Sequence, residues 1–218
     1  MPTKFICLAN SFKEGGRCIA GIELDENDNL VIVEGRPKWI RPICDSPHGE
    51  VPTHLVSHLN ILDIIEIEVT GTQQANYQSE NVLFRQNSIR KISTFNKENL
   101  SILCDNRNLI FGNRGKAVSE EAITNLNYSL MFIKTNKFEV IGKTYEDTPN
   151  RTQLRLVFSY NDNQYDFPIT DPVFLHQYQT NPDFMEHFQE VFISLSLGVV
   201  WKDWYYKLVA GIIFKTVE

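Results

Sequence analysis

Alternation of apolar and polar residues is the clearest signal in the first half of the chain. Residues 61–72 predict a long strand, because Ile65, Ile67 and Val69 alternate with polar side chains. Such a pattern is typical of an antiparallel strand with one buried face. Shorter strands are predicted at residues 4–9, 18–24, 30–33 and 82–84.

Polar and proline-containing segments separate these strands. Residues 10–16 predict a polar loop that ends in two glycines, and residues 45–60 a loop rich in Pro, Gly and His. Pro42 is expected to end any strand pairing that begins near Trp39, because proline has no backbone N–H to donate. A short helix is expected within residues 95–104, after Asn96.

The second half of the chain repeats the strand pattern with stronger turn and capping signals. Ser119, followed by two glutamates, predicts a helix start, as do Asp171 before Pro172 and Asn181 before Pro182. Residues 191–197 fit either a continuation of the last of these helices or a strand. The remaining strands are predicted at residues 129–133, 137–141, 153–160, 164–169, 199–201 and 205–214, with Asn-Asp-Asn at 161–163 as a hairpin turn.

These elements predict a mainly β fold with a few short helices, arranged as two small antiparallel barrels in tandem. Gly112-Asn113-Arg114-Gly115 interrupts any regular element. We therefore expect an N-terminal barrel with a basic connecting segment over residues 1–112, and a C-terminal barrel with an inserted helix over residues 113–218.

Composition narrows the class of protein. Of the 218 residues 42% are hydrophobic, enough for a packed core, and no apolar run approaches the ~18–20 residues that span a bilayer. Cys7, Cys18, Cys44 and Cys104 have unrelated spacings and form no Cys-x-x-Cys pair. The N-terminus carries no export signal, so we expect a cytoplasmic protein with reduced, buried cysteines and no membrane partner.

The net charge of −6 argues against bulk attraction to nucleic acid, but the charge is unevenly distributed. Residues 85–116 hold seven basic and two acidic side chains, between two acidic stretches. This basic segment either contacts a phosphate backbone or is an exposed connection whose charges pair with acidic neighbours.

The segment from Ser11 to Arg17 is the first candidate ligand site. It offers the Ser11 hydroxyl, the cations Lys13 and Arg17, and flexible glycines at Gly15 and Gly16, which let a backbone approach an anion closely. The ending Gly-Lys-Ser/Thr of a Walker A loop is missing. The structural alternative is a hairpin turn that needs positive φ.

The second candidate combines an aromatic ring with cations. If residues 39–41 form a strand, Trp39 and Arg41 share one face, with Lys38 beside them and Ile40 pointing inward. Proteins that bind single strands use such rings and cations on bases and backbone. The alternative is a tryptophan at the edge of the core with an arginine stacked over it.

Other chemistry-bearing residues have simpler structural interpretations. His48, His54 and His58 lie in a segment broken by Pro and Gly, and Asp162, Asp166 and Asp171 include a turn residue and a helix cap. Trp201, Trp204, Tyr205 and Tyr206 form either a core or inter-domain seam or a partner surface. We expect no catalytic residue, no metal and no cofactor.

Several segments, in order along the chain, resemble the bacterial dual OB-fold domain family. They are residues 6–11 (ICLANS), 15–21 (GGRCIAG), 39–42 (WIRP), 63–66 (DIIE), 165–172 (YDFPITDP), 194–198 (SLSLG) and 206–213 (YKLVAGII). The resemblance implies tandem OB-like barrels and recognition of nucleic acid or a nucleotide in a prokaryotic defence or regulatory setting. Fold alone does not fix function.

The sequence therefore predicts a non-catalytic binding or sensing module with a nucleic acid or nucleotide-like ligand. The alternative is a protein-interaction or scaffolding subunit, in which the acidic faces and the C-terminal aromatic residues contact another protein.

Overall fold

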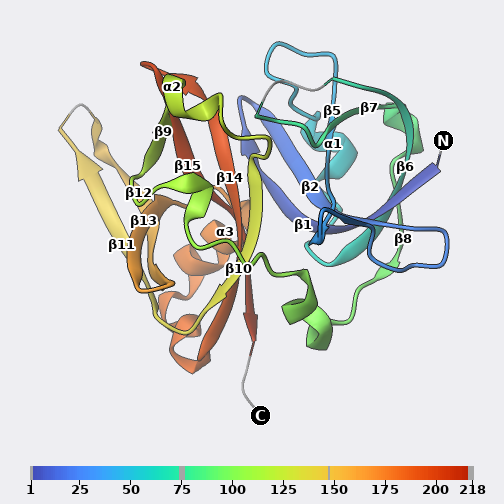
Figure 1. Cartoon of the computed structure of the whole chain (residues 1–218). Helices are drawn as coiled ribbons and strands as arrows, with labels where there is room; N and C mark the ends of the chain where they lie inside the picture. Colours follow the sequence, from blue (N-terminus) through green and yellow to red (C-terminus); the bar gives the residue numbers. More distant parts are fainter. Residues whose placement is uncertain (1, 74–76, 147, 216–218) are drawn as a thin grey trace.

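Two β-barrels lie side by side in the computed structural model, which describes residues 2–73, 77–146 and 148–215 (Figure 1). The first barrel is drawn in blue to green and the second in yellow to red. The predicted mainly β fold is therefore confirmed. The first barrel is built from β1 (Pro2–Lys13), β2 (Gly16–Leu24), β5 (Trp39–Ile43), β6 (Asp63–Thr72) and β7 (Asn81–Phe84).

The first barrel closes through one parallel seam. Its strand order is β1-β2-β5-β7-β6. The last strand, β6, also pairs with β1, which therefore pairs with both β2 and β6 and closes the ring. All pairings are antiparallel except that of β5 with β7. An OB barrel has this five-stranded Greek-key arrangement. Strand β8 (Arg90–Thr94) pairs with β6 outside the ring.

The second barrel repeats that order with a split first strand. It is built from β10 (Leu130–Thr135), β11 (Phe138–Tyr145), β12 (Thr148–Tyr160), β13 (Asn163–Pro168), β14 (Glu190–Trp201) and β15 (Trp204–Lys215). β10 pairs with β14, and β11 pairs with β12, so the two pieces act as one bent strand. The seam between β13 and β15 is a parallel bridge from Ile169 to Val209, and β9 (Ala117–Ser119) extends β15.

Short helices and turns connect the strands. The α-helices are α1 (Thr53–Val56), α2 (Glu120–Ile123) and α3 (Pro172–Thr180). The 3₁₀ turns are η1 (Gln86–Ser88), η2 (Lys97–Leu103), η3 (Ile110–Gly112) and η4 (Pro182–His187), and β3 (Ile32–Val33) pairs with β4 (Arg36–Pro37). Within the described ranges, no helix is long and apolar enough to cross a membrane.

The barrels share a packed junction as well as having their own interiors. Ile6 and Leu8 of β1 belong to the same buried cluster as Phe132 of β10 and Phe192 of β14, whose rings stack at 5.8 Å. The Ser194 hydroxyl donates to the Leu8 carbonyl across the junction. A Cβ on Gly211 of β15 would lie 2.3 Å from the Leu8 oxygen, so only glycine permits this close crossing.

The capping residues Ser119, Asp171 and Asn96 and the hairpin turn after residue 160 are confirmed. Ser119 and Asp171 accept hydrogen bonds from the first turns of α2 and α3, and Asn96 caps η2. Asn161 and Asp162 form the β12–β13 turn with φ of 47° and 59°, as expected for a hairpin of this kind. Residues 191–197 are strand, the second of the two alternatives.

The predicted loop at residues 10–16 is wrong. β1 continues to Lys13 and pairs Ser11 with Cys18, so the turn consists of Glu14 and Gly15 alone. The polar side chain of Asn10 does not break the strand, because its amide donates to the carbonyls of Val56 and Leu59. The expected loop at 45–60 likewise contains α1.

The prediction that Pro42 ends strand pairing is also wrong. Pro42 lies within β5 and is paired with Val82 in the parallel seam. In a parallel ladder alternate N–H groups face the partner. The Arg41 N–H donates to the Glu80 carbonyl at 2.8 Å, and on the other edge of β5 the pairing with β2 stops at Ile40, so the N–H that proline lacks is not needed.

The helix predicted after Asn181 is reduced to η4. The Asn181 side chain makes no capping hydrogen bond, and the segment forms a 3₁₀ turn. Phe184 and Phe188 pack on Phe214 with ring centroids 5.4 and 4.7 Å away. These aromatic contacts, rather than the cap, fix the turn.

Candidate functional site

A cavity of about 480 Å³ lies between the two barrels. One wall comes from β1, β2 and β5 of the first barrel, and the other from the β14–β15 hairpin of the second. Its lining is formed by Ser11, Phe12, Lys13, Glu14, Cys18, Arg41, His48, Gln78, Ser196, Leu197, Gly198, Val199, Val200, Trp201, Tyr206 and Leu208. Rings, aliphatic side chains and a few cations therefore face the same space.

The first-barrel wall is centred on the β1–β2 hairpin. Glu14 and Gly15 form its turn with φ of 40° and 82°, which brings Phe12 and Lys13 to the tip of the strand. Phe12 is 54% exposed, and the guanidinium of Arg17 lies 4.6 Å from its ring centroid. The hairpin thus presents an aromatic face with cations beside it.

Lys13 is half-buried, and its pKa is lower than that of a lysine in water. Burial lowers its pKa, and nearby Arg41 lowers it further, whereas Cys18, Glu50 and Glu14 act in the opposite direction. Burial is the largest of these effects because it removes water from the charged form. A lysine in this environment is stabilised by an anion.

The second-barrel wall is an exposed apolar hairpin. Trp201 is 57% exposed, and its ring centroid lies 5.8 Å from that of Tyr206 across the hairpin. Lys202 and Asp203 form the turn with positive φ, and the Lys202 ammonium lies 4.4 Å from the Trp201 centroid. Large exposed rings beside a cation are typical of binding surfaces.

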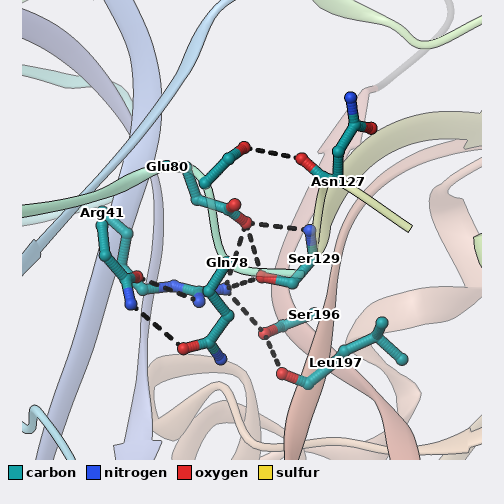
Figure 2. Close-up of polar contacts among 9 residues, drawn as sticks. Arg41, Gln78, Glu80, Asn127, Ser129, Ser196 and Leu197 are labelled. Atoms are coloured by element: carbon teal, nitrogen blue, oxygen red, sulfur yellow. Dashed lines mark hydrogen bonds and ion pairs between the residues drawn. The ribbon is translucent and has the colours of Figure 1, made fainter. Parts of the chain in front are cut away.

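A buried polar network connects the two walls (Figure 2). Arg41 of β5 donates to the Ser129 hydroxyl at 2.9 Å and to the Ser196 hydroxyl at 3.4 Å, both in the second barrel. Glu80 lies 3.6 Å from the Arg41 guanidinium and accepts the Ser129 N–H at 3.0 Å. Arg41 and Glu80 are almost fully buried, so the network fixes the position of one wall relative to the other.

The structure places the residues of the Ser11–Arg17 candidate in different surroundings. Ser11 and Lys13 line the cavity. Gly15 provides the turn with nothing within 4 Å of its missing Cβ, whereas Gly16 lies against the Val51 carbonyl. Arg17 stacks on Phe12 and donates to the Asn10 carbonyl at 3.4 Å. The structural alternative, a hairpin turn with positive φ, is therefore present at Glu14 and Gly15.

The residues of the second candidate site, Lys38, Trp39 and Arg41, also lie in different environments. Arg41 belongs to the cavity lining although it is almost fully buried, and Ile40 points into the first barrel as predicted. Trp39 packs at the junction against Ala9, and the Lys38 ammonium pairs with Glu23 at 2.7 Å. Trp39 and Arg41 do share one face of β5, but the second barrel covers it.

The basic segment is largely neutralised by neighbouring carboxylates. Its ion pairs are Arg85–Glu68, Arg90–Glu66, Lys91–Asp63, Arg107–Asp105 and Lys116–Asp166. Of the two interpretations of this segment, these pairs support the exposed connection.

The histidine, aspartate and cysteine side chains considered in the sequence analysis form no additional site among the residues that the structure describes. In the described part of the chain, no three His, Cys, Asp or Glu side chains are placed to hold a metal ion. The Asp166 carboxylate accepts a hydrogen bond from the Arg155 guanidinium. Asp171 caps α3 and also accepts a hydrogen bond from the Ile212 N–H. All four cysteines are free, and burial raises the pKa of the Cys7 thiol.

Sequence reasoning missed Phe12 as a site residue and left Trp201 and Tyr206 undecided between seam and partner surface. In the structure Trp201 and Tyr206 are exposed cavity residues, whereas the neighbouring Tyr205 is partly buried and packs against the core of the second barrel. For Trp201 the sequence did contain a signal, because tryptophans stand on both sides of the Lys202-Asp203 turn. Residues at the tip of a hairpin have few neighbours to bury them, so exposure of these rings could have been predicted.

The sequence matches the profile of the dual OB-containing domain over residues 3–212. No curated protein matches it.

Two of the solved structures that the chain resembles are distant from it. One is the tetrameric p202 HIN2, with 6% identity and a TM-score of 0.30 over 100% of this chain and 92% of that one. The other is a chain of a replication protein A heterotrimer bound to ssDNA, with 9% identity and a TM-score of 0.37, covering 98% of this chain and 48% of that one. These likenesses are too distant to add to the family match.

Proposed function

The chain belongs to the dual OB-containing domain family, and from that premise we propose that it is a binding module that takes single-stranded nucleic acid into the cavity between its barrels. The observation that carries the proposal is the pairing of Phe12 and Trp201, exposed rings on opposite walls of one cavity, with lysines beside them. Stacking of bases on such rings is tolerant of sequence and contributes about 1–3 kcal/mol per base.

The position of the cavity in the fold supports the proposal. OB folds bind oligonucleotides and oligosaccharides on the face of their second and third strands, between the loop of strands 1–2 and the loop of strands 4–5. In the first barrel these strands are β2 and β5, and the loops are β1–β2 and β6–β7. Cys18, Arg41, Glu14 and Gln78 bring all four parts to the cavity.

The charge of the cavity favours binding of a strand over its cleavage. Glu14 is the carboxylate of the lining, whereas cleavage of a phosphodiester by two metals needs several convergent acids. With a net charge of −6, affinity depends on the few cations at the cavity. The salt dependence should therefore be shallow, about 0.7 in slope for each phosphate contacted.

The first prediction compares two tryptophans of one hairpin. Trp201→Ala should weaken binding of a labelled single strand of about 12 nucleotides roughly 5- to 150-fold, because it removes one stacking surface. Trp204→Ala is the matched control: Trp204 is 47% exposed but lies outside the cavity lining. Fluorescence anisotropy with DNA and RNA strands measures both.

Equal affinities for the two variants would contradict the placement of the site. If neither DNA nor RNA strands bind the parent protein, the proposed function fails. The exposed side chains of Val199, Val200 and Trp201 would then be assigned to a protein partner, in line with the scaffolding alternative.

A further inference from the structure

A second hollow adjoins the cavity, and Lys13 lines both of them. This second hollow has a volume of about 340 Å³. It shares Lys13, His48, Gln78 and Val199 with the first. A ligand that occupies both hollows therefore lies against the Lys13 side chain.

Lys13 has no ion pair with any residue that the structure describes. Glu50 is close enough to influence it, but one Glu50 oxygen already accepts from the Ser46 hydroxyl at 2.9 Å and the His48 N–H at 3.1 Å. A half-buried ammonium without a partner is stabilised when an anion replaces the water it has lost. His48 is exposed and lines both hollows with Lys13, so its ring can donate a hydrogen bond to an anion there.

The two hollows differ in chemistry, and both suit a base. The first presents Phe12, Trp201 and Tyr206, which provide faces for stacking. The second is lined by Gln73, Gln78 and Asn81. The Asn81 amide donates to the Gln78 side-chain oxygen at 3.1 Å and accepts from Arg41 at 3.4 Å, so the Gln73 amide and the Gln78 NH₂ group are the ones offered to a base edge. Unstacked bases are recognised by stacking together with hydrogen bonds to their edges.

We propose that the site recognises a two-nucleotide step: one phosphodiester lies at Lys13, one flanking base stacks in the first hollow, and the other base enters the second. This inference rests on the proposed function and adds a minimal ligand to it. It assigns Lys13 to a single phosphate, whereas the rings are assigned to bases.

The test uses dinucleoside monophosphates, which carry one phosphodiester and leave no choice of register. Their affinities, followed by quenching of tryptophan fluorescence, are compared with those of single nucleosides and of the neutral methylphosphonate analogue. The parent protein should bind the charged dinucleotide about tenfold or more tightly than the neutral one. In Lys13→Met, which keeps the apolar stem, the two should bind equally.

Lys97→Met is the control, because Lys97 is an exposed lysine of η2 outside both hollows. It should keep the preference for the charged dinucleotide. The inference is overturned if Lys13→Met still prefers the charged form, or if longer strands bind while a dinucleotide binds no better than a nucleoside. Failure of the longer strands to bind overturns the proposed function itself, so the two failures are distinguishable.

Discussion

At the scale of single residues, Lys207 shows how a buried charge is held. Its ammonium donates to the Ile110 carbonyl at 2.7 Å, the Asn113 carbonyl at 2.8 Å and the Asn113 side-chain oxygen at 2.9 Å. Among the described residues it has no carboxylate partner. Burial lowers the Lys207 pKa from 10.5 to about 7. This ties the segment before β9 to β15, at an electrostatic cost.

That cost predicts a dependence of stability on pH. Between pH 7 and 10.5 the unfolded chain binds a proton that the folded protein has released, so the contribution of Lys207 to stability rises with pH in this window. Urea unfolding should show the parent protein gaining stability relative to Lys207→Met from pH 7 to 9.5. The comparison cancels the other titrating groups. A constant difference would mean that the folded protein keeps Lys207 charged.

At the scale of elements, the crossing of β1 and β15 decides how the barrels pack. The Gly211→Ala substitution should destabilise the protein by roughly 1–3 kcal/mol or more, because the new Cβ meets the Leu8 backbone oxygen at 2.3 Å. Gly71→Ala in β6 is the control, since its nearest neighbour is a leucine methyl group at 3.9 Å. Thermal unfolding measures both, and similar midpoints would show that the strands can separate without cost.

At the scale of the whole molecule, the Arg41 network and the shared core join the barrels into one unit. Arg41→Met should cost about 3–5 kcal/mol, because it leaves Glu80 buried without a counter-charge. Adding Glu80→Gln, which keeps an acceptor for Ser129, should recover part of that loss. Arg85→Met, which breaks an exposed pair, should cost less than about 1 kcal/mol.

Urea unfolding of the parent protein should be a single cooperative transition followed equally by fluorescence and circular dichroism. Two separated transitions, or a double variant no more stable than Arg41→Met, would mean that the barrels are independent and that the network does not couple them. The walls of the cavity would then be free to move apart.

Features that depend on a few neighbouring residues could be predicted from the sequence. Ser119 and Asp171 begin helices, residues 161–163 turn a hairpin, and the alternation at residues 61–72 gives β6. These follow from hydrogen bonds and periodicity within one turn or one strand. The family resemblance supplied the tandem OB-like barrels that such local signals cannot give, and the match over residues 3–212 confirms that resemblance.

The identity of the side chains that face the cavity depends on how the two barrels pack, and the sequence could not show it. Arg41 meets Ser129 and Ser196, 88 and 155 positions further along the chain, and the second barrel covers Trp39. Trp201 and Phe12 face one space because the β14–β15 hairpin of one barrel reaches the β1–β2 hairpin of the other. Strand propensity is local, whereas the burial of a ring is set by whatever distant segment packs on it, so the sequence identified aromatic and cationic residues without showing which of them meet.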